Sequence, residues 1–167
     1  MAAPMKRLLL LDDEPSVLSA VTRVLRQVYA PAVLAIESFQ FPEEGLLRFA
    51  DTSFHVVICD YRMPGLNGAD VLQMMRQLQP CAVRILLSGT DDVADLARVV
   101  NEGHVFRIVR KPWDGRTLLA AVHAAFEHVP VCTQPVSNAQ ALELARLESE
   151  EPGITRVQWT IDGSIRL

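Results

Sequence analysis

The sequence predicts an α/β fold in which a parallel sheet carries helices on both faces. Two observations lead to this prediction. Short runs that are almost continuously apolar, such as Leu8–Leu11 and Val56–Cys59, alternate with stretches whose apolar residues follow helical spacing. Strands that are apolar on both faces are typical of parallel sheets covered by helices. The alternation gives five strands and five helices, but the pattern does not fix the strand order.

The individual elements follow from periodicity and from proline positions. The expected strands are Leu8–Leu11, Ala32–Glu37, Val56–Cys59, Val83–Leu87 and Val105–Val109. The expected helices run from Pro15 to Val28, from Pro42 to Phe49, and over Ala69–Leu78, Val93–Val100 and Arg116–His128. Pro15 and Pro42 suit the first turn of a helix, because the N–H that proline lacks would have no partner there.

The chain changes character after Val129, which predicts a first domain over 5–129 and a tail over 130–167. A capping box at 137–140 begins a predicted helix that ends near Glu150, before Pro152. Alternating apolar residues around Trp159, followed by an Asp-Gly turn, predict a small β-hairpin. Because such a hairpin is marginal alone, we expect it to pack on its own domain, on a second subunit or on a partner.

Composition narrows the class of protein. The chain has 167 residues, 50% of them hydrophobic, and 16 basic against 20 acidic residues, which does not favour a nucleic-acid binder. The apolar run at Leu8–Leu11 is too short for a signal peptide or a membrane span, so we expect a reduced, cytoplasmic compartment. Cys59, Cys81 and Cys132 show neither zinc spacing nor an even disulfide framework; Cys59 and Cys81 are expected to be small core residues.

Polar residues with reactive groups follow four of the predicted strands. They are Asp12 and Asp13 after the first, Asp60 after the third, Ser88 after the fourth and Lys111 after the fifth. The carboxyl ends of parallel strands share one edge of a sheet, where α/β folds bind their ligands. Asp13 and Asp60 could bind Mg²⁺ directly, with Asp12 acting through water. Asp60 could attack phosphorus, while Lys111 and Ser88 hold phosphoryl oxygens.

Each of these residues also has an ordinary structural interpretation. An Asp-Asp pair after a strand often caps a helix, and a single Asp at a strand end is often a loop residue. Ser-Gly is commonly a turn, and Lys-Pro carries little information alone. The complete set in this order is hard to explain by structure alone.

The chain resembles the receiver domain of two-component response regulators over about residues 5–128. The matching residues are Asp12-Asp13, Asp60 with Met63-Pro64 and Gly68, Ser88-Gly89 and Lys111-Pro112. The resemblance implies a flavodoxin-like, doubly wound five-stranded parallel sheet of order 2-1-3-4-5. It implies a bacterial phosphorelay protein whose Asp60 is phosphorylated by a sensor histidine kinase or a phosphotransfer protein. Mg²⁺ would be bound by Asp12, Asp13, Asp60 and the backbone carbonyl of Arg62, and Ser88 and Lys111 would contact the phosphoryl group.

The output is less well defined by the sequence. Many receivers have Tyr or Phe three residues before the lysine, where this chain has Ile108; Phe106 would lie on the same face if both were in the strand. The stretch around 101–113 resembles receivers found beside HD-type output modules. We expect signalling through contacts with an unknown downstream protein, without direct DNA or membrane binding. Homodimerisation through the last helix and strand is possible.

Two other functions remain open at this stage. One is a Mg²⁺-dependent phosphatase or phosphotransferase with an Asp nucleophile. Such enzymes usually have a second acid two residues after the nucleophile, where this chain has Arg62. The other is a degenerate receiver that only binds a partner. The expected protein is not a dedicated enzyme, although it could dephosphorylate itself.

Overall fold

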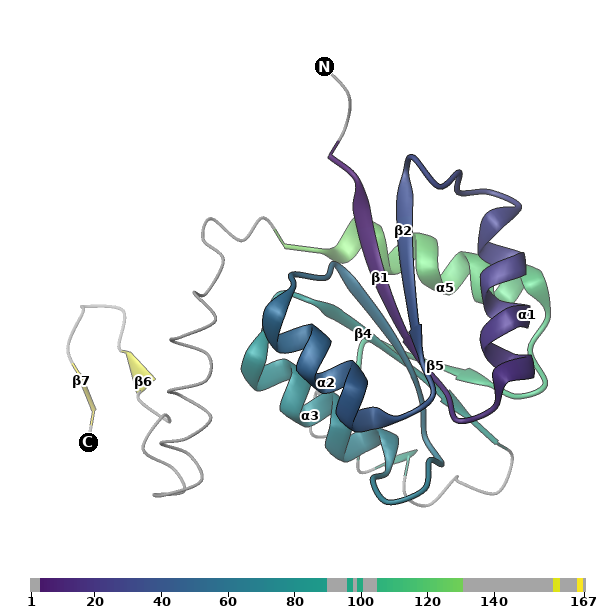
Figure 1. The fold of residues 1–167 in the computed structure, drawn as a ribbon. Helices are drawn as coiled ribbons and strands as arrows, with labels where there is room; N and C mark the ends of the chain where they lie inside the picture. Colours follow the sequence, from purple (N-terminus) through teal and green to yellow (C-terminus); the bar gives the residue numbers. More distant parts are fainter. Residues whose placement is uncertain are drawn as a thin grey trace.

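A single five-stranded parallel sheet forms the centre of the molecule (Figure 1). The computed structural model describes residues 4–89, 96–97, 99–100, 105–130, 158–159 and 165–166. The sheet has the order β2-β1-β3-β4-β5, which confirms the flavodoxin-like topology. Its strands are β1 (Lys6–Leu11), β2 (Leu34–Phe39), β3 (Val56–Asp60), β4 (Val83–Ser88) and β5 (Arg107–Arg110). The helices are α1 (Pro15–Arg26), α2 (Pro42–Asp51), α3 (Gly68–Leu78) and α5 (Gly115–His128).

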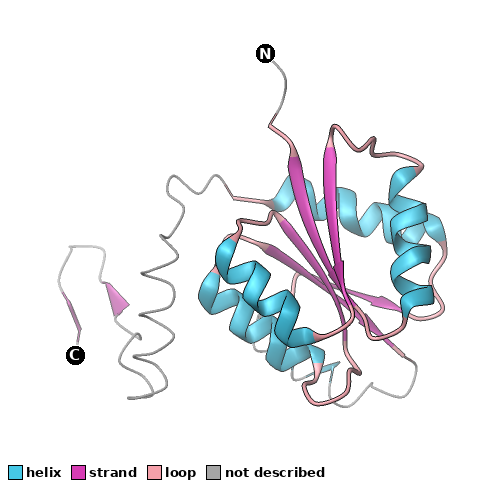
Figure 2. Ribbon diagram, viewed as in Figure 1, coloured by secondary structure: helices cyan, strands magenta, loops and turns pink. Residues whose placement is uncertain are grey.

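Helices cover both faces of the sheet, which explains why the strands are apolar throughout (Figure 2). Helices α1 and α5 lie on one face, and α2 and α3 on the other (Figure 1). In β1, Leu8 and Leu10 pack in the core under α1 and α5, whereas Leu9 and Leu11 pack in the core under α2 and α3. All four side chains are fully buried, as strands covered on both faces require.

The helix starts agree with the sequence to within one residue. Pro15 and Pro42 begin α1 and α2 as predicted. Helix α3 begins at Gly68, one residue earlier than expected, because the Asn67 side chain accepts a hydrogen bond from the Asp70 N–H at 2.9 Å. Helix α5 likewise begins at Gly115, after the N-cap residue Asp114.

Three local predictions were wrong. Strand β2 begins at Leu34 instead of Ala32, because the N–H groups of Val33 and Leu34 bond to the Ala30 carbonyl in a turn. Strand β5 begins at Arg107, two residues later than expected. Val28 lies beyond the end of α1 and is 62% exposed, so it does not continue the buried face of that helix.

The rest of the chain is described only in part. Two short strands, β6 (Gln158–Trp159) and β7 (Ile165–Arg166), pair antiparallel as the predicted hairpin requires. The predicted linker and the helix ending near 150 lie outside the described residues. Of the predicted helix at 93–100, residues 96, 97, 99 and 100 are described and are helical. No helix in the described part of the chain is long and apolar enough to cross a membrane.

The two described cysteines differ. Cys59 is a buried free thiol in β3, as predicted. Cys81 lies in the turn before β4, is only half-buried and is disulfide-bonded, so the prediction of a core thiol was wrong for it. Its place in a turn at the end of the sheet, and not inside the strand, explains why it is not fully buried. Cys132 lies outside the described residues.

Candidate functional site

The sheet brings the strand-end residues to one edge, as the sequence predicted. In the register of β3 and β4, Asp60 pairs with Leu87. Backbone hydrogen bonds continue beyond the strands, from the Tyr61 N–H to the Leu87 carbonyl at 2.8 Å and from the Lys111 N–H to the Ser88 carbonyl at 2.7 Å. Asp60, Ser88 and Lys111 therefore lie at the ends of three neighbouring strands.

Three acidic side chains meet at this edge. One carboxylate oxygen from each of Asp12, Asp13 and Asp60 lies within 4.8 Å of the others. Asp12 is fully buried and Asp60 is 5% exposed, while Asp13 is partly exposed. Buried carboxylates this close repel one another unless a cation compensates them, and oxygen ligands of this kind suit a hard divalent ion. The donor set therefore fits a metal site.

Lys111 supplies one compensating charge. Its Nζ lies 2.8 Å from Asp60 Oδ1 and 3.0 Å from Asp12 Oδ2, so the ammonium bridges the two buried acids. Burial alone would lower the pKa of Lys111, but its bonds to Asp60 and Asp12 outweigh burial and raise the pKa. Lys111 is therefore held as a cation. Three carboxylates and one ammonium give a formal charge of −2 when all are ionised.

The surroundings of Asp60 raise the pKa of its carboxyl group. Burial raises its pKa, the hydrogen bond from Lys111 opposes this effect, and the neighbouring charges of Asp12 and Asp13 raise it further. The adjacent Cys59 thiol is affected in the same direction, since burial and then the charges of Asp60 and Asp12 raise its pKa well above the usual range. Cys59 is therefore an unreactive core thiol.

Asp12 is oriented by the backbone and does not cap the helix. Its Oδ1 accepts a hydrogen bond from the Glu14 N–H at 2.9 Å, while its Oδ2 contacts Lys111. The N-cap residue of α1 is Glu14, whose side chain makes no capping bond. Asp12 therefore does not cap α1: the Glu14 N–H holds one of its oxygens, and the other contacts Lys111 in the cluster. The sequence does not reveal this hydrogen bond, because its donor is a backbone N–H, which every residue except proline carries.

Ser88 is the third buried polar residue at this edge. Its side chain is fully buried, and its Oγ has no hydrogen-bond partner among the described residues. A buried hydroxyl without a partner costs free energy, so it is most easily explained by a ligand oxygen that it meets during function. Arg62, whose backbone carbonyl the resemblance implies as a metal ligand, lies two residues after Asp60, and its side chain is exposed.

The turn after Asp60 packs directly on the backbone of Asp60 itself. The Gly68 N–H donates to the Tyr61 carbonyl at 2.7 Å. A Cβ built on Gly68 would lie 2.1 Å from the Asp60 carbonyl oxygen, so no other residue fits without displacing that backbone. Gly65 has φ +86°, a conformation that glycine adopts readily. These two positions explain the glycines of the motif at 63–68.

Phe106 does not take the place of the missing aromatic residue. It precedes β5 and packs with the core under α1 and α5, where its ring stacks on His128 with centroids 4.7 Å apart. Ile108 lies inside β5 and packs on the opposite side, with the core under α2 and α3. The expectation that both residues share a face was wrong, because the two-residue alternation holds only within a strand.

Residues 8–123 match the family model of the response regulator receiver domain. The chain belongs to this family. It is therefore a receiver domain of two-component signal transduction, a class of domains that accept a phosphoryl group and are generally not enzymes.

Several proteins of known sequence resemble this receiver. The hydrogenase transcriptional regulatory protein HoxA of Cupriavidus necator is 35% identical over 119 residues, which is 71% of this chain and 24% of HoxA. The response regulator protein TodT of Pseudomonas putida is 29% identical over 78% of this chain and 54% of TodT. The chain thus spans about a quarter of HoxA's length and about half of TodT's.

Solved structures agree with the fold. The signal receiver domain of an HD domain-containing protein from Pseudomonas fluorescens Pf-5 superposes with a TM-score of 0.69 at 28% identity, over 77% of this chain and 91% of that one. A response regulator receiver domain protein from Clostridium thermocellum gives a TM-score of 0.66 at 28% identity, over 74% and 95% of the two chains.

Proposed function

We propose that this receiver accepts a phosphoryl group on Asp60 from a sensor histidine kinase or a phosphotransfer protein. The observation that carries the proposal is the Lys111 ammonium, which bridges Asp60 and Asp12 inside a cluster of three acids. A carboxylate oxygen of Asp60 would attack phosphorus, and the bond from phosphorus to the donor's leaving group would break, giving an acyl phosphate. Lys111 would stay near the new negative charge and pair with a phosphoryl oxygen.

Mg²⁺ is the cofactor that suits this site best. The formal charge of −2 on the cluster matches one divalent cation, and the donors are all oxygens. Asp12, Asp13, Asp60 and the Arg62 carbonyl would hold the ion, which supplies charge neutralisation for the incoming phosphoryl group. Ser88, whose buried hydroxyl has no partner among the described residues, would donate to a phosphoryl oxygen.

We further propose that residues 5–129 form the receiver and that 130–167 act in protein–protein contacts with a downstream partner. The tail carries five acidic and three basic residues, so its charge does not favour DNA binding. Homodimerisation stays a prediction. The stretch around 101–113 resembles receivers found beside HD-type output modules. The similarity to the receiver of an HD domain-containing protein agrees with that resemblance.

Acetyl phosphate provides a direct test of the function. The protein is incubated with this donor and Mg²⁺ and its intact mass is measured. We expect a stoichiometric, acid-stable, hydroxylamine-labile adduct of about 80 Da, the mass of one phosphoryl group on a carboxylate. The adduct should disappear in Asp60→Asn and persist in Asp51→Asn, a matched change at an exposed acid on α2.

The other outcomes favour the other functions. Rapid multiple turnover of phosphate esters would indicate a phosphatase or phosphotransferase, and slow loss of the adduct would indicate autodephosphorylation only. Failure to form any adduct with the wild-type protein, under conditions where Mg²⁺ binds, would contradict the proposal and favour a binding module.

A further inference from the structure

A histidine joins three strands at the end of the sheet opposite the acidic cluster. His55 directly precedes β3, and its backbone N–H donates to the Arg7 carbonyl of β1 at 2.9 Å. The His55 carbonyl accepts a hydrogen bond at 2.9 Å from the N–H of Val83, the first residue of β4. His55 and Asp60 are five residue steps apart, about 16 Å at ~3.3 Å per residue. His55 therefore lies where three strands begin, far from Asp60.

The imidazole ring of His55 adds a further bond to this junction. Its Nδ1 accepts a hydrogen bond from the Arg7 backbone N–H at 3.0 Å, so both backbone groups of Arg7 are bonded to His55. Because the donor is a backbone N–H, Nδ1 has to offer a lone pair, and the proton of the neutral ring then lies on Nε2. A protonated ring carries N–H groups on both nitrogens and accepts nothing. The bond from the Arg7 N–H therefore requires the neutral ring.

Arg7 connects this junction to β2 and α2. Its Nη2 lies 2.8 Å from Glu37 Oε1 in β2, and its guanidinium carbon lies 5.7 Å from the centroid of the Phe54 ring. Glu37 is shared with α2, because Arg48 Nε lies 2.6 Å from Glu37 Oε2. Losing the bond between His55 and the Arg7 backbone would therefore loosen the residue that links β1 to both elements.

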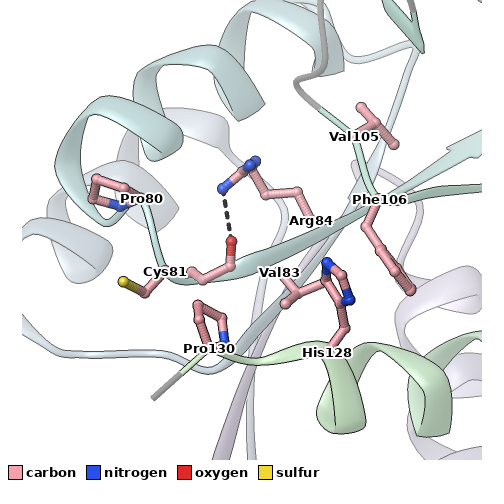
Figure 3. Close-up of a pocket in the computed structure, with 9 residues that line it drawn as sticks. Pro80, Cys81, Val83, Arg84, Val105, Phe106, His128 and Pro130 are labelled. Carbon is pink, nitrogen blue, oxygen red and sulfur yellow. Dashed lines mark hydrogen bonds between the residues drawn. The ribbon is translucent and has the colours of Figure 1, made fainter. Parts of the chain in front are cut away.

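The charged groups at this end of the sheet oppose a positive charge on the ring. The neighbouring elements contribute Lys6 and Arg7 of β1, Glu37 of β2, Arg84 of β4, Arg48 and Asp51 of α2, and Arg76 of α3. Five of these seven side chains are cations, and both carboxylates are already bonded to Arg48. Arg84 Nη1 donates to the Ala82 carbonyl at 2.6 Å, beside a cavity of about 390 Å³ at the turn into β4 (Figure 3).

Burial and these charges act on His55 in the same direction. Burial of the ring lowers the pKa of His55, and the positive charges of Lys6 and Arg7 lower it further. The folded protein therefore favours the neutral ring, which is the form that the Arg7 N–H requires.

We propose that the His55–Arg7 contact makes the amino end of the sheet sensitive to acid. Protonation of Nδ1 by solvent turns two N–H groups against each other, breaks the bond from the Arg7 N–H and releases the start of β1 from β3. The released Arg7 also holds Glu37 less firmly, so the receiver loses stability as the pH falls below neutral. This contact lies at the end of β3 opposite Asp60, and its response needs no phosphoryl group.

Thermal melts at about pH 7.5 and about pH 5.5, on either side of the usual pKa of histidine, test the proposal. His55→Asn keeps an acceptor that does not titrate, because the Asn Oδ1 takes the place of Nδ1. The pKa of His55 is lower in the folded protein than its unfolded value of about 6.5, so stability present above that pH is lost below it. We expect the melting temperature to fall by about 2–8 °C more in the wild type than in His55→Asn. His123→Asn, which changes an α5 histidine with a 68% exposed side chain, should keep the wild-type loss.

NMR of the wild-type protein gives a second test that depends on no variant. Long-range proton–nitrogen spectra at neutral pH should show the ring proton of His55 on Nε2. As the pH falls, the Arg7 amide signal should shift with the same midpoint as the His55 ring, below about 6.5. A ring proton on Nδ1, an Arg7 amide signal that does not follow the ring, or an equal loss of melting temperature in wild type and His55→Asn would overturn the proposal.

Discussion

Gly68→Ala gives the sharpest test of how the fold positions Asp60. The added Cβ would lie 2.1 Å from the Asp60 carbonyl oxygen and 2.9 Å from the Tyr61 Cα. Both neighbours are backbone atoms in a buried segment, so they cannot rotate away as a flexible side chain would. Relief requires the start of α3 to move by about 1 Å relative to β3. Overpacking of this kind costs about 1–3 kcal/mol.

Gly115→Ala is the matched control, because Gly115 is the first residue of α5 as Gly68 is of α3. Its Cβ would lie 3.7 Å and 3.8 Å from two Val24 carbons, which is ordinary van der Waals contact. Alanine also favours a helix over glycine by up to about 1 kcal/mol. We therefore expect Gly115→Ala to leave the stability unchanged or slightly raised.

Urea denaturation followed by circular dichroism measures both effects. Gly68→Ala should lower the free energy of unfolding by about 1–3 kcal/mol, or the melting temperature by about 3–12 °C in a domain of this size. If Asp60 is the phosphoacceptor, a displacement near 1 Å should also slow phosphorylation by acetyl phosphate on the order of 100-fold. Equal unfolding midpoints for Gly68→Ala and Gly115→Ala would refute the steric argument.

Two other predictions concern the same end of the sheet. Asn67→Ala removes both the acceptor for the Asp70 N–H and the donor to the Asp70 carboxylate, and should lower the free energy of unfolding by about 1 kcal/mol. Asn67→Ser should retain the cap, and thermal melts check both. Mg²⁺ affinity should fall as pH decreases through the raised pKa of Asp60, because the neutral acid is a poor ligand. In the metal-free protein, the free energy of unfolding should decrease as pH rises through the same raised pKa. Calorimetry with and without Mg²⁺ measures both trends. An Mg²⁺ affinity that does not change down to the usual pKa range of Asp would contradict the first trend.

The sequence could predict the sheet because four of its five strands are marked twice, by an apolar run and by the polar residues that follow it. The runs at Leu8–Leu11 and Val56–Cys59 are buried on both faces, and only a strand covered on both sides needs so many apolar residues in succession. Once the strands are parallel, Asp12, Asp60 and Lys111 must lie at one edge. Their contacts at 2.8 Å and 3.0 Å follow from that topology.

The orientation of the site could not be predicted in the same way. The Glu14 N–H that turns Asp12 away from a capping role depends on the path of the chain before Pro15, and a backbone donor leaves no signal in the residue type. The disulfide of Cys81 also went unpredicted, since spacing along the chain says nothing about which distant residues meet beside the turn into β4. Both depend on tertiary proximity.

Phe106 shows where a pattern argument reaches its limit. The residues from Val105 to Val109 are mostly apolar, so alternation predicts that 106 and 108 point the same way, but this holds only if both belong to the strand. Strand β5 begins at Arg107, and the bend before it turns Phe106 onto His128 while Ile108 packs under the helices of the other face. The Phe106 ring packs on the face covered by α5, so it does not occupy the position of Ile108 on the other face. Among the described residues, the direct links between this edge of the sheet and that face are Ile108 itself and the backbone hydrogen bond from the Lys111 N–H to the Ser88 carbonyl.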